Sequence, residues 1–342
     1  MRMLPAVSVP PWLHALAFVA AAALPAGAWT DVTAAPTGTA GHDPAVVERL
    51  FALDPDRVSG REVAEVLARV PAPRIVLFQG SFALVTMAPL AEFLVAMGYP
   101  PDRVRHPRDG SYSLSSFTDS RQIAGTLAWY YESEGVRPLM IGHSQGGMMA
   151  IRVLHELAGA FGDSIPVWNP VTDAPLPRSV IVDPLSGDAR PVVGFRLPYV
   201  AVLATGKLAR VLLGQWEMLA KLREIPDTTE EFTGFAIEWD LIAGLFPRSD
   251  PYLAKGSATV RNVILPAAYT HIGLPETLHL ANDPATREWI EAYVPDGNAA
   301  LPDSAGVDTT NLVHAADIWH SVKRHWTIEA RRLVGAQRRG HE

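Results

Sequence analysis

Hydrophobic and polar residues follow two alternating patterns in the first half of the chain. Short apolar runs predict buried parallel strands at 74–78 and 138–141, and a more polar run predicts one at 103–106. Apolar residues recur at helical spacing over 59–69, 87–97, 115–134 and 145–161. The first of these helices begins with Ser59 and Glu62, which have the spacing of a capping box. Alternating strands and helices predict an α/β fold with a parallel sheet covered on both faces.

The pattern loosens after residue 162. Many prolines lie in 162–198, where 179–182 is a strand candidate, and a surplus of apolar residues over 199–224 predicts one or two helices. The remaining predicted elements are strands at 232–239 and 260–265 and closing helices over 275–293 and 310–336. Trp319 and Trp326 lie in the last helix beside lysine and arginine residues, which we expect to form a solvated basic face.

The first 28 residues have the pattern of a cleaved signal peptide rather than of a folded segment. Arg2 precedes an apolar run over 13–24, Pro25 interrupts it, and residues 26–28 are small, as at a cleavage site. A membrane anchor is the alternative, but the run is shorter than the ~20 apolar residues that a spanning helix needs. We therefore expect an exported protein, periplasmic or secreted, without an integral membrane segment in its mature chain.

Composition excludes several classes of function. The chain has 342 residues, and its 29 Lys and Arg against 36 Asp and Glu give a net charge of −7. Such an acidic balance provides no global attraction for nucleic acid. The absence of cysteine excludes a disulfide scaffold, a thiolate metal site and a cysteine nucleophile. Covalent chemistry would have to use another nucleophile, such as serine.

The motif Gly142-x-Ser144-x-Gly146 is the most informative feature of the sequence. It joins a buried strand directly to a helix, which is the context of a nucleophile elbow. Glycines two residues either side avoid clashes with the neighbouring strand and helix, and the turn exposes the Ser144 hydroxyl at a helix N-terminus. The alternative is a glycine-rich turn without chemistry.

Residues 138–150 resemble the elbow of α/β-hydrolases, and Gly-His-Ser-Gln-Gly is a form seen in bacterial lipases and esterases. The resemblance implies an α/β-hydrolase domain over 29–342, with a mostly parallel central sheet flanked by helices. It also implies an insertion between the elbow helix and the acid strand, which we expect to be a helical cap over about 185–230.

The same resemblance implies the order serine, acid, histidine, with each partner on a loop after a later strand. His271 lies six residues after the predicted strand 260–265, on a loop before a helix, and is our candidate base. His279 and His314 fall within helical patterns. His143 neighbours the nucleophile, and we expect it to point away from Ser144 and to be structural.

Asp240 follows the predicted strand 232–239 and is our candidate for the triad acid. Asp183 follows the run 179–182 and is the alternative, because some members of the family carry the acid one strand earlier. Glu238 and Asp250 are weaker candidates. Any of these carboxylates would orient the imidazole and stabilise the imidazolium.

The resemblance also implies an oxyanion hole of two backbone N–H groups. Gln145 follows the nucleophile and provides the first. The second N–H group comes from the loop after strand 74–78. Ser81 is the expected donor there, and Phe82 is the alternative. This chain has Gln79-Gly80 where the family often has His-Gly, which leaves the identity of the second donor open.

These residues predict an exported serine hydrolase that cleaves a small-molecule or lipid-like carboxylic ester through an acyl-enzyme. An acyltransferase with the same triad is an alternative, and a non-catalytic binding protein on this scaffold is a third reading. We expect no metal or organic cofactor, since His155-Glu156 does not continue to the second histidine of a zinc motif. The sequence does not indicate the oligomeric state.

Overall fold

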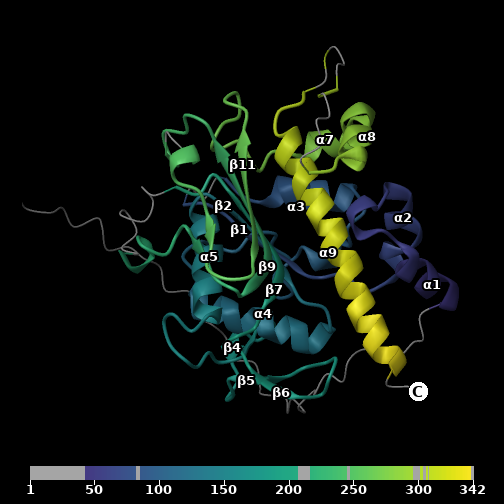
Figure 1. The fold of residues 1–342 in the computed structure, drawn as a ribbon, viewed down its shortest axis with the longest axis vertical. Helices are drawn as coiled ribbons and strands as arrows, with labels where there is room; N and C mark the ends of the chain where they lie inside the picture. The colour runs from purple at the N-terminus through teal and green to yellow at the C-terminus, as the bar shows by residue number, and fades with distance from the viewer. Residues whose placement is uncertain are drawn as a thin grey trace, which may run out of the picture. The chain divides into compact units, whose positions relative to one another are not determined.

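A parallel sheet organises the part of the chain that the structure describes (Figure 1). The computed structural model describes residues 43–81, 85–206, 216–244, 247–295, 301–302, 306 and 308–339. Within these ranges, five strands lie in the order β1–β2–β7–β9–β11, and each neighbouring pair is parallel. Their bounds are β1 Ile75–Phe78, β2 Leu139–His143, β7 Leu197–Leu203, β9 Thr229–Ile237 and β11 Thr259–Leu265.

Helices and short elements connect these strands. The α-helices are α1 Pro44–Ala52, α2 Gly60–Glu65, α3 Ala88–Ala96, α4 Ser120–Glu134, α5 Gln145–Leu157, α7 Leu278–Asn282, α8 Pro284–Ala292 and α9 Leu312–Arg339. Short 3-10 helices are η2 Pro55–Arg57, η3 Leu67–Arg69, η4 Pro101–Arg103, η5 Trp216–Met218 and η6 Pro247–Ser249. Three two-stranded pairs lie outside the sheet: β3 Trp168–Asn169 with β4 Ala174–Pro175, β5 Val180–Val182 with β6 Ala189–Pro191, and β8 Glu224–Ile225 with β10 Leu253–Ala254.

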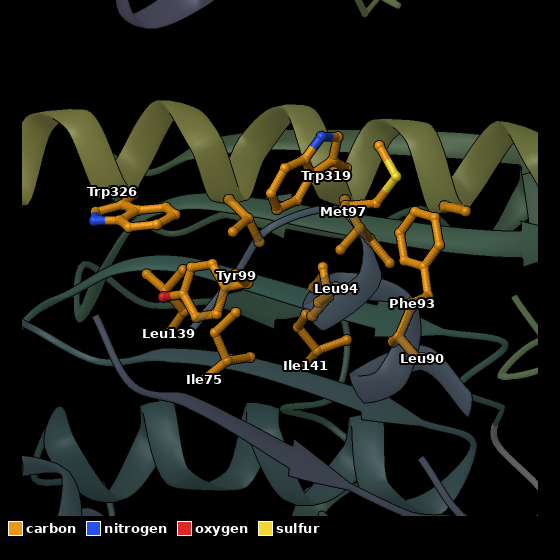
Figure 2. Close-up of a cluster of buried hydrophobic side chains, with 14 of the residues drawn as sticks. Ile75, Leu90, Phe93, Leu94, Met97, Tyr99, Leu139, Ile141, Trp319 and Trp326 are labelled. Carbon is orange, nitrogen blue, oxygen red and sulfur yellow. The ribbon is translucent and has the colours of Figure 1, made fainter. Parts of the chain in front are cut away.

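The strands β1, β2 and β7 are fully buried, and residues along them alternate between two hydrophobic clusters on the two faces of the sheet. Val76, Phe78 and Met140 pack with α4 and α5 on one face. On the other face α3 and α9 cover the sheet, as Figure 2 shows for Ile75 and Ile141 beneath Trp319. Figure 1 shows α9, in yellow, opposite α4 and α5. Burial on both faces explains why these strands are apolar runs without a two-residue period.

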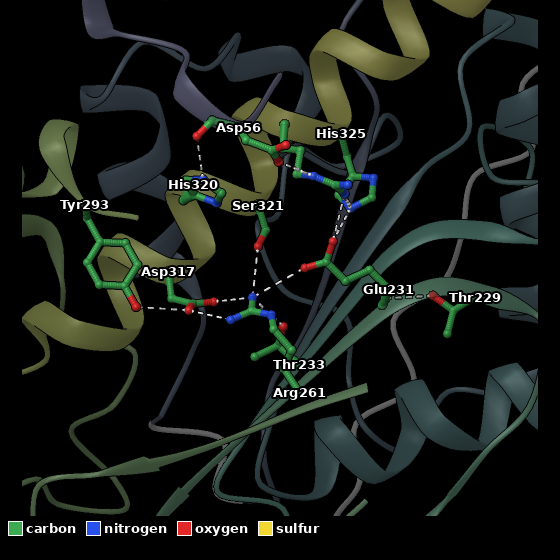
Figure 3. A network of polar contacts seen from close by, with 11 residues as sticks. Asp56, Thr229, Glu231, Thr233, Arg261, Tyr293, Asp317, His320, Ser321 and His325 are labelled. Atoms are coloured by element: carbon green, nitrogen blue, oxygen red, sulfur yellow. Dashed lines mark hydrogen bonds and ion pairs between the residues drawn. The ribbon is translucent and has the colours of Figure 1, made fainter. Parts of the chain in front are cut away.

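Helix α9 is held to the sheet by charges as well as by its apolar face. Arg261 on β11 donates to both carboxylate oxygens of Asp317, each at 2.7 Å (Figure 3). Glu231 on β9 accepts from Arg324 and lies 3.0 Å from His325. Lys323, 3% exposed, donates to the carbonyl of Val58. The predicted solvated basic face is therefore wrong for Lys323 and Arg324, whose charges instead fasten the N-terminal segment and β9 to α9.

Most predicted elements of the first half are confirmed within a few residues. The capping box of Ser59 and Glu62 is present at α2. Two predictions are wrong. Residues 103–106 form a 3-10 turn and loop rather than a strand, because Pro101 and Pro107 flank the run and remove hydrogen-bond donors. Phe117 is exposed and precedes α4, which begins only after its N-cap, Asp119.

The helices predicted over 199–224 are also wrong in the described residues. Leu197–Leu203 is the central strand β7, fully buried, and Trp216–Met218 is a single 3-10 turn. A short apolar run buried on both faces has no period that separates strand from helix. Residues 185–206 and 216–230 contain no α-helix, so a helical cap is wrong for these ranges. Residues 207–215 lie outside the described residues.

The predicted signal peptide, residues 1–28, lies outside the described residues and stays a prediction. Among the helices that the structure does describe, none combines the length and the apolar character needed to cross a bilayer. The predicted α/β arrangement, a parallel sheet flanked by helices, is confirmed.

Candidate active site

Ser144 lies at a sharp turn between β2 and α5. Its backbone has φ 55° and ψ −118°, a strained conformation for a residue with a side chain. Side chains at the flanking glycines would collide with backbone atoms: one at Gly142 with the carbonyl of Gly146, and one at Gly146 with the carbonyl of Phe78. The glycines therefore permit the close approach of strand, turn and helix that exposes the serine hydroxyl.

The structure brings Ser144, His271 and Asp240 together in one chain of hydrogen bonds. Nε2 of His271 lies 2.9 Å from Oγ of Ser144, and Nδ1 lies 2.7 Å from Oδ2 of Asp240. Each residue follows the carboxyl end of a different parallel strand: Ser144 follows β2, Asp240 follows β9 and His271 follows β11. With Nδ1–H donating to the carboxylate, Nε2 is free to accept the proton of the serine hydroxyl.

Asp240 is 6% exposed, and its carboxylate is held by the loop that follows it. Oδ1 accepts hydrogen bonds from the backbone N–H groups of Ile242 and Ala243, at 2.8 and 3.0 Å. Burial acts to raise the pKa of Asp240, but the hydrogen bond from His271 and those two amides outweigh it and lower the pKa below its ordinary value. The carboxylate is therefore charged at neutral pH and oriented toward the imidazole.

The loop that carries His271 is fastened by side chains of α9 and its preceding residue. Nδ2 of Asn311 donates to the carbonyls of Gly273 and Glu276, at 2.7 and 2.9 Å. Nε2 of His314 lies 2.8 Å from the carbonyl of Leu274. These bonds hold the backbone that follows His271 against the first turn of the last helix.

The loop after β1 lies directly against the nucleophile. A Cβ at Gly80 would lie 3.1 Å from Cβ of Ser144, closer than an ordinary van der Waals contact, so the glycine favours this close approach. The hydroxyl of Ser81 donates to Oε1 of Gln145, which ties the loop to the first residue of α5. Ser81 is thus placed beside the elbow, whereas the alternative donor, Phe82, lies outside the described residues.

The alternative acids are occupied elsewhere. Asp183 lies on the β5–β6 hairpin, where it accepts from Tyr131 and pairs with Arg190. Glu238 pairs with Arg248, and Asp250 pairs with Arg223. Asp183 is therefore wrong as the partner of His271 in this structure, because its strand belongs to a hairpin outside the sheet.

Sequence reasoning missed the contribution of His143. Its ring lies against that of His271, and Nε2 lies 2.7 Å from the carbonyl oxygen of His271. The motif Gly-His-Ser places a ring with two nitrogens beside the nucleophile, and that pattern was the available signal. Among the described residues, no group of three or more His, Asp or Glu has the arrangement of a metal site.

Comparison with models of protein families finds none that matches the chain, and comparison with curated proteins finds no match either.

Proposed function

We propose that this chain is a serine hydrolase of the α/β-hydrolase fold that cleaves carboxylic esters through an acyl-enzyme on Ser144. One observation carries the proposal: an elbow serine, a histidine and a buried carboxylate form a continuous hydrogen-bonded series with distances of 2.9 and 2.7 Å. The parallel sheet and the position of each residue after its strand support the same reading.

In the proposed acylation, Oγ of Ser144 attacks the ester carbonyl while its proton passes to Nε2 of His271. Asp240 keeps its hydrogen bond to Nδ1 and stabilises the imidazolium that forms. The imidazolium then protonates the leaving alcohol. In the second half, His271 takes a proton from water while the water oxygen attacks the acyl carbonyl. The bond between the acyl carbon and Oγ of Ser144 then breaks, the imidazolium returns the proton to Oγ, and the carboxylic acid leaves.

The negative oxygen of each tetrahedral intermediate needs preorganised donors. We assign the backbone N–H of Gln145, at the N-terminus of α5, where the helix dipole favours negative charge. We assign the second to the N–H of Ser81, because its loop lies against Ser144 and is tied to Gln145.

Exposed apolar side chains flank the acid and the base and favour an ester with a large apolar group. Trp239 and Leu241, either side of Asp240, are 61% and 81% exposed, and Ile272, next to His271, is 55% exposed. Apolar surface beside the reacting groups gains free energy when a hydrocarbon chain covers it. A lipid-like substrate is therefore the class that we propose.

Export remains part of the proposal and rests on the pattern of residues 1–28 alone. Expression of the full chain in a bacterial host, followed by N-terminal sequencing of the processed protein, should give Trp29 as the first residue. An unprocessed N-terminus would contradict the predicted signal peptide and would leave the catalytic proposal unaffected.

Hydrolysis of p-nitrophenyl esters by the purified protein and by Ser144→Ala tests the catalytic proposal. We expect the variant to lose turnover and to keep the native circular dichroism and melting temperature. Unchanged turnover in Ser144→Ala would contradict the mechanism. Addition of a competing alcohol separates hydrolysis from acyl transfer, since a transferase would form the new ester.

A further inference from the structure

His143 is the last residue of β2 and the immediate neighbour of the nucleophile. Its side chain is 2% exposed, and its ring lies against that of His271, with centroids 5.2 Å apart. Nε2 of His143 lies 2.7 Å from the carbonyl oxygen of His271. The proposed nucleophile and base are thus joined twice: once through the serine hydroxyl, and once through the residue that precedes it.

The direction of this second bond follows from its partners. A carbonyl oxygen only accepts, so Nε2 of His143 carries a proton and donates. Nδ1 of His143 is buried and has no hydrogen-bond partner among the described residues, and a Cβ on Gly80 would lie 3.5 Å from it. Burial and the neighbouring His271 lower the pKa of His143 to about 4, so its ring is neutral when it donates.

This contact differs from the other bonds that hold the same loop. The bonds from Asn311 and His314 end on Gly273, Leu274 and Glu276, which follow His271 in the chain. The bond from His143 ends on the main chain of His271 itself. A shift of this carbonyl moves the imidazole relative to the serine, whereas shifts farther along can be absorbed by the intervening residues.

We infer that His143 is a positioning residue, which fixes the distance between Oγ of Ser144 and Nε2 of His271 by donating to the His271 carbonyl. The inference rests on the proposed function, because only a reaction between these two atoms makes their separation matter. A misplacement of about 1 Å between reacting groups can cost ~100-fold in rate. The expected effect is therefore on the chemical step rather than on substrate binding.

Two substitutions at His143 separate donation from packing. His143→Phe keeps a planar ring and removes the donor, whereas His143→Gln keeps an N–H donor at about the reach of Nε2. His155→Phe is the matched control: His155 is also buried, lies on α5 and contacts two carbonyls, those of Lys221 and Glu224. Its contacts are remote in the chain from the reacting residues.

Circular dichroism and the melting temperature first establish that the native protein and the three variants are folded. Ester hydrolysis and the rate of fluorophosphonate labelling are then measured for all four proteins. We expect kcat of His143→Phe to fall ~100-fold with KM unchanged and with a matching fall in labelling rate. His143→Gln should recover kcat to within about tenfold of native, since the carbonyl keeps a donor. His155→Phe should lose stability and keep its kcat.

Three results would overturn the inference. Native kcat in folded His143→Phe would show that the contact does not position the base. Equal losses in the Phe and Gln variants would assign the effect to packing. If His143→Phe does not fold, the Gln variant decides alone, and a ~100-fold loss there contradicts donation. A native protein that neither hydrolyses esters nor labels at Ser144 instead overturns the proposed function, and the positioning role with it.

Discussion

Acid should destabilise the fold through two buried neutral histidines, His143 and His314. Burial lowers the pKa of each from 6.5 to about 4, although hydrogen bonds to carbonyls of the His271 loop oppose the shift. Between pH 6.5 and 4 the unfolded chain therefore binds more protons than the folded one. The stability is fully present above pH 6.5 and falls as the pH drops through this window.

The size of the effect follows from the difference between the two pKa values. About 1.4 kcal/mol for each pH unit of difference gives roughly 3 kcal/mol for each histidine. The two together would remove a large share of the 5–15 kcal/mol that typically stabilises a domain. Burial also lowers the pKa of His155 and of His320, which acts in the same direction.

His314→Phe tests this calculation. The ring lies edge-on to Phe235 and Tyr269, and its Nε2 is 2.8 Å from the carbonyl of Leu274. Phenylalanine has a similar shape and loses that hydrogen bond, which costs roughly 1–3 kcal/mol at pH 7.5. Phenylalanine binds no proton in either state, so between pH 7.5 and 5.0 its stability should fall by about 2 kcal/mol less than that of the native protein.

The assay is guanidinium-induced unfolding, followed by tryptophan fluorescence, at pH 7.5, 6.0 and 5.0. The variant should be the less stable protein at pH 7.5, and the difference should shrink toward pH 5.0. Leu280→Ala is the control, because Leu280 is buried on α7 and carries no titratable group, so its loss should lower stability and leave the slope with pH unchanged. Parallel curves for the native protein and His314→Phe would refute the reasoning.

Three further predictions concern the site and its support. Asp240→Asn should lower kcat ~10⁴-fold in steady-state kinetics, because the amide favours the wrong tautomer of His271; a loss below tenfold would contradict the assignment. Asp317→Ala should cost about 3–5 kcal/mol in guanidinium unfolding, because it leaves the Arg261 charge without its bidentate partner. Trp239→Ala should raise KM about tenfold for long-chain esters and little for acetates; equal effects would remove Trp239 from substrate binding.

The candidate site could be predicted more completely than the fold around it. The elbow has a local sequence pattern, and His271 and Asp240 follow recognisable strands, so order along the chain was enough to select them. Asp183 also follows a strand candidate, and only pairing between strands separates the two acids. The pairing of strands depends on contacts between distant residues, so the local pattern of hydrophobic and polar residues does not predict it.

The misassigned β7 and the contacts of α9 have related physical causes. Leu197–Leu203 is apolar on both faces, so its sequence is compatible with a strand or a buried helix. Lys323 and Arg324 look like solvated charges in the sequence, yet they donate to Val58, Asp56 and Glu231, which lie more than 90 residues away. Similarly, the donor role of His143 depends on where the His271 loop folds back.

Covalent labelling tests the central proposal most directly. The native protein is treated with a fluorophosphonate, and the adduct is located by peptide mass spectrometry, beside Ser144→Ala and the native protein unfolded in guanidinium. We predict one adduct, on Ser144, in the folded native protein alone, because the serine is nucleophilic only while His271 and Asp240 are in place. An unlabelled native protein, or an adduct that persists in Ser144→Ala, would contradict a serine hydrolase built on this triad.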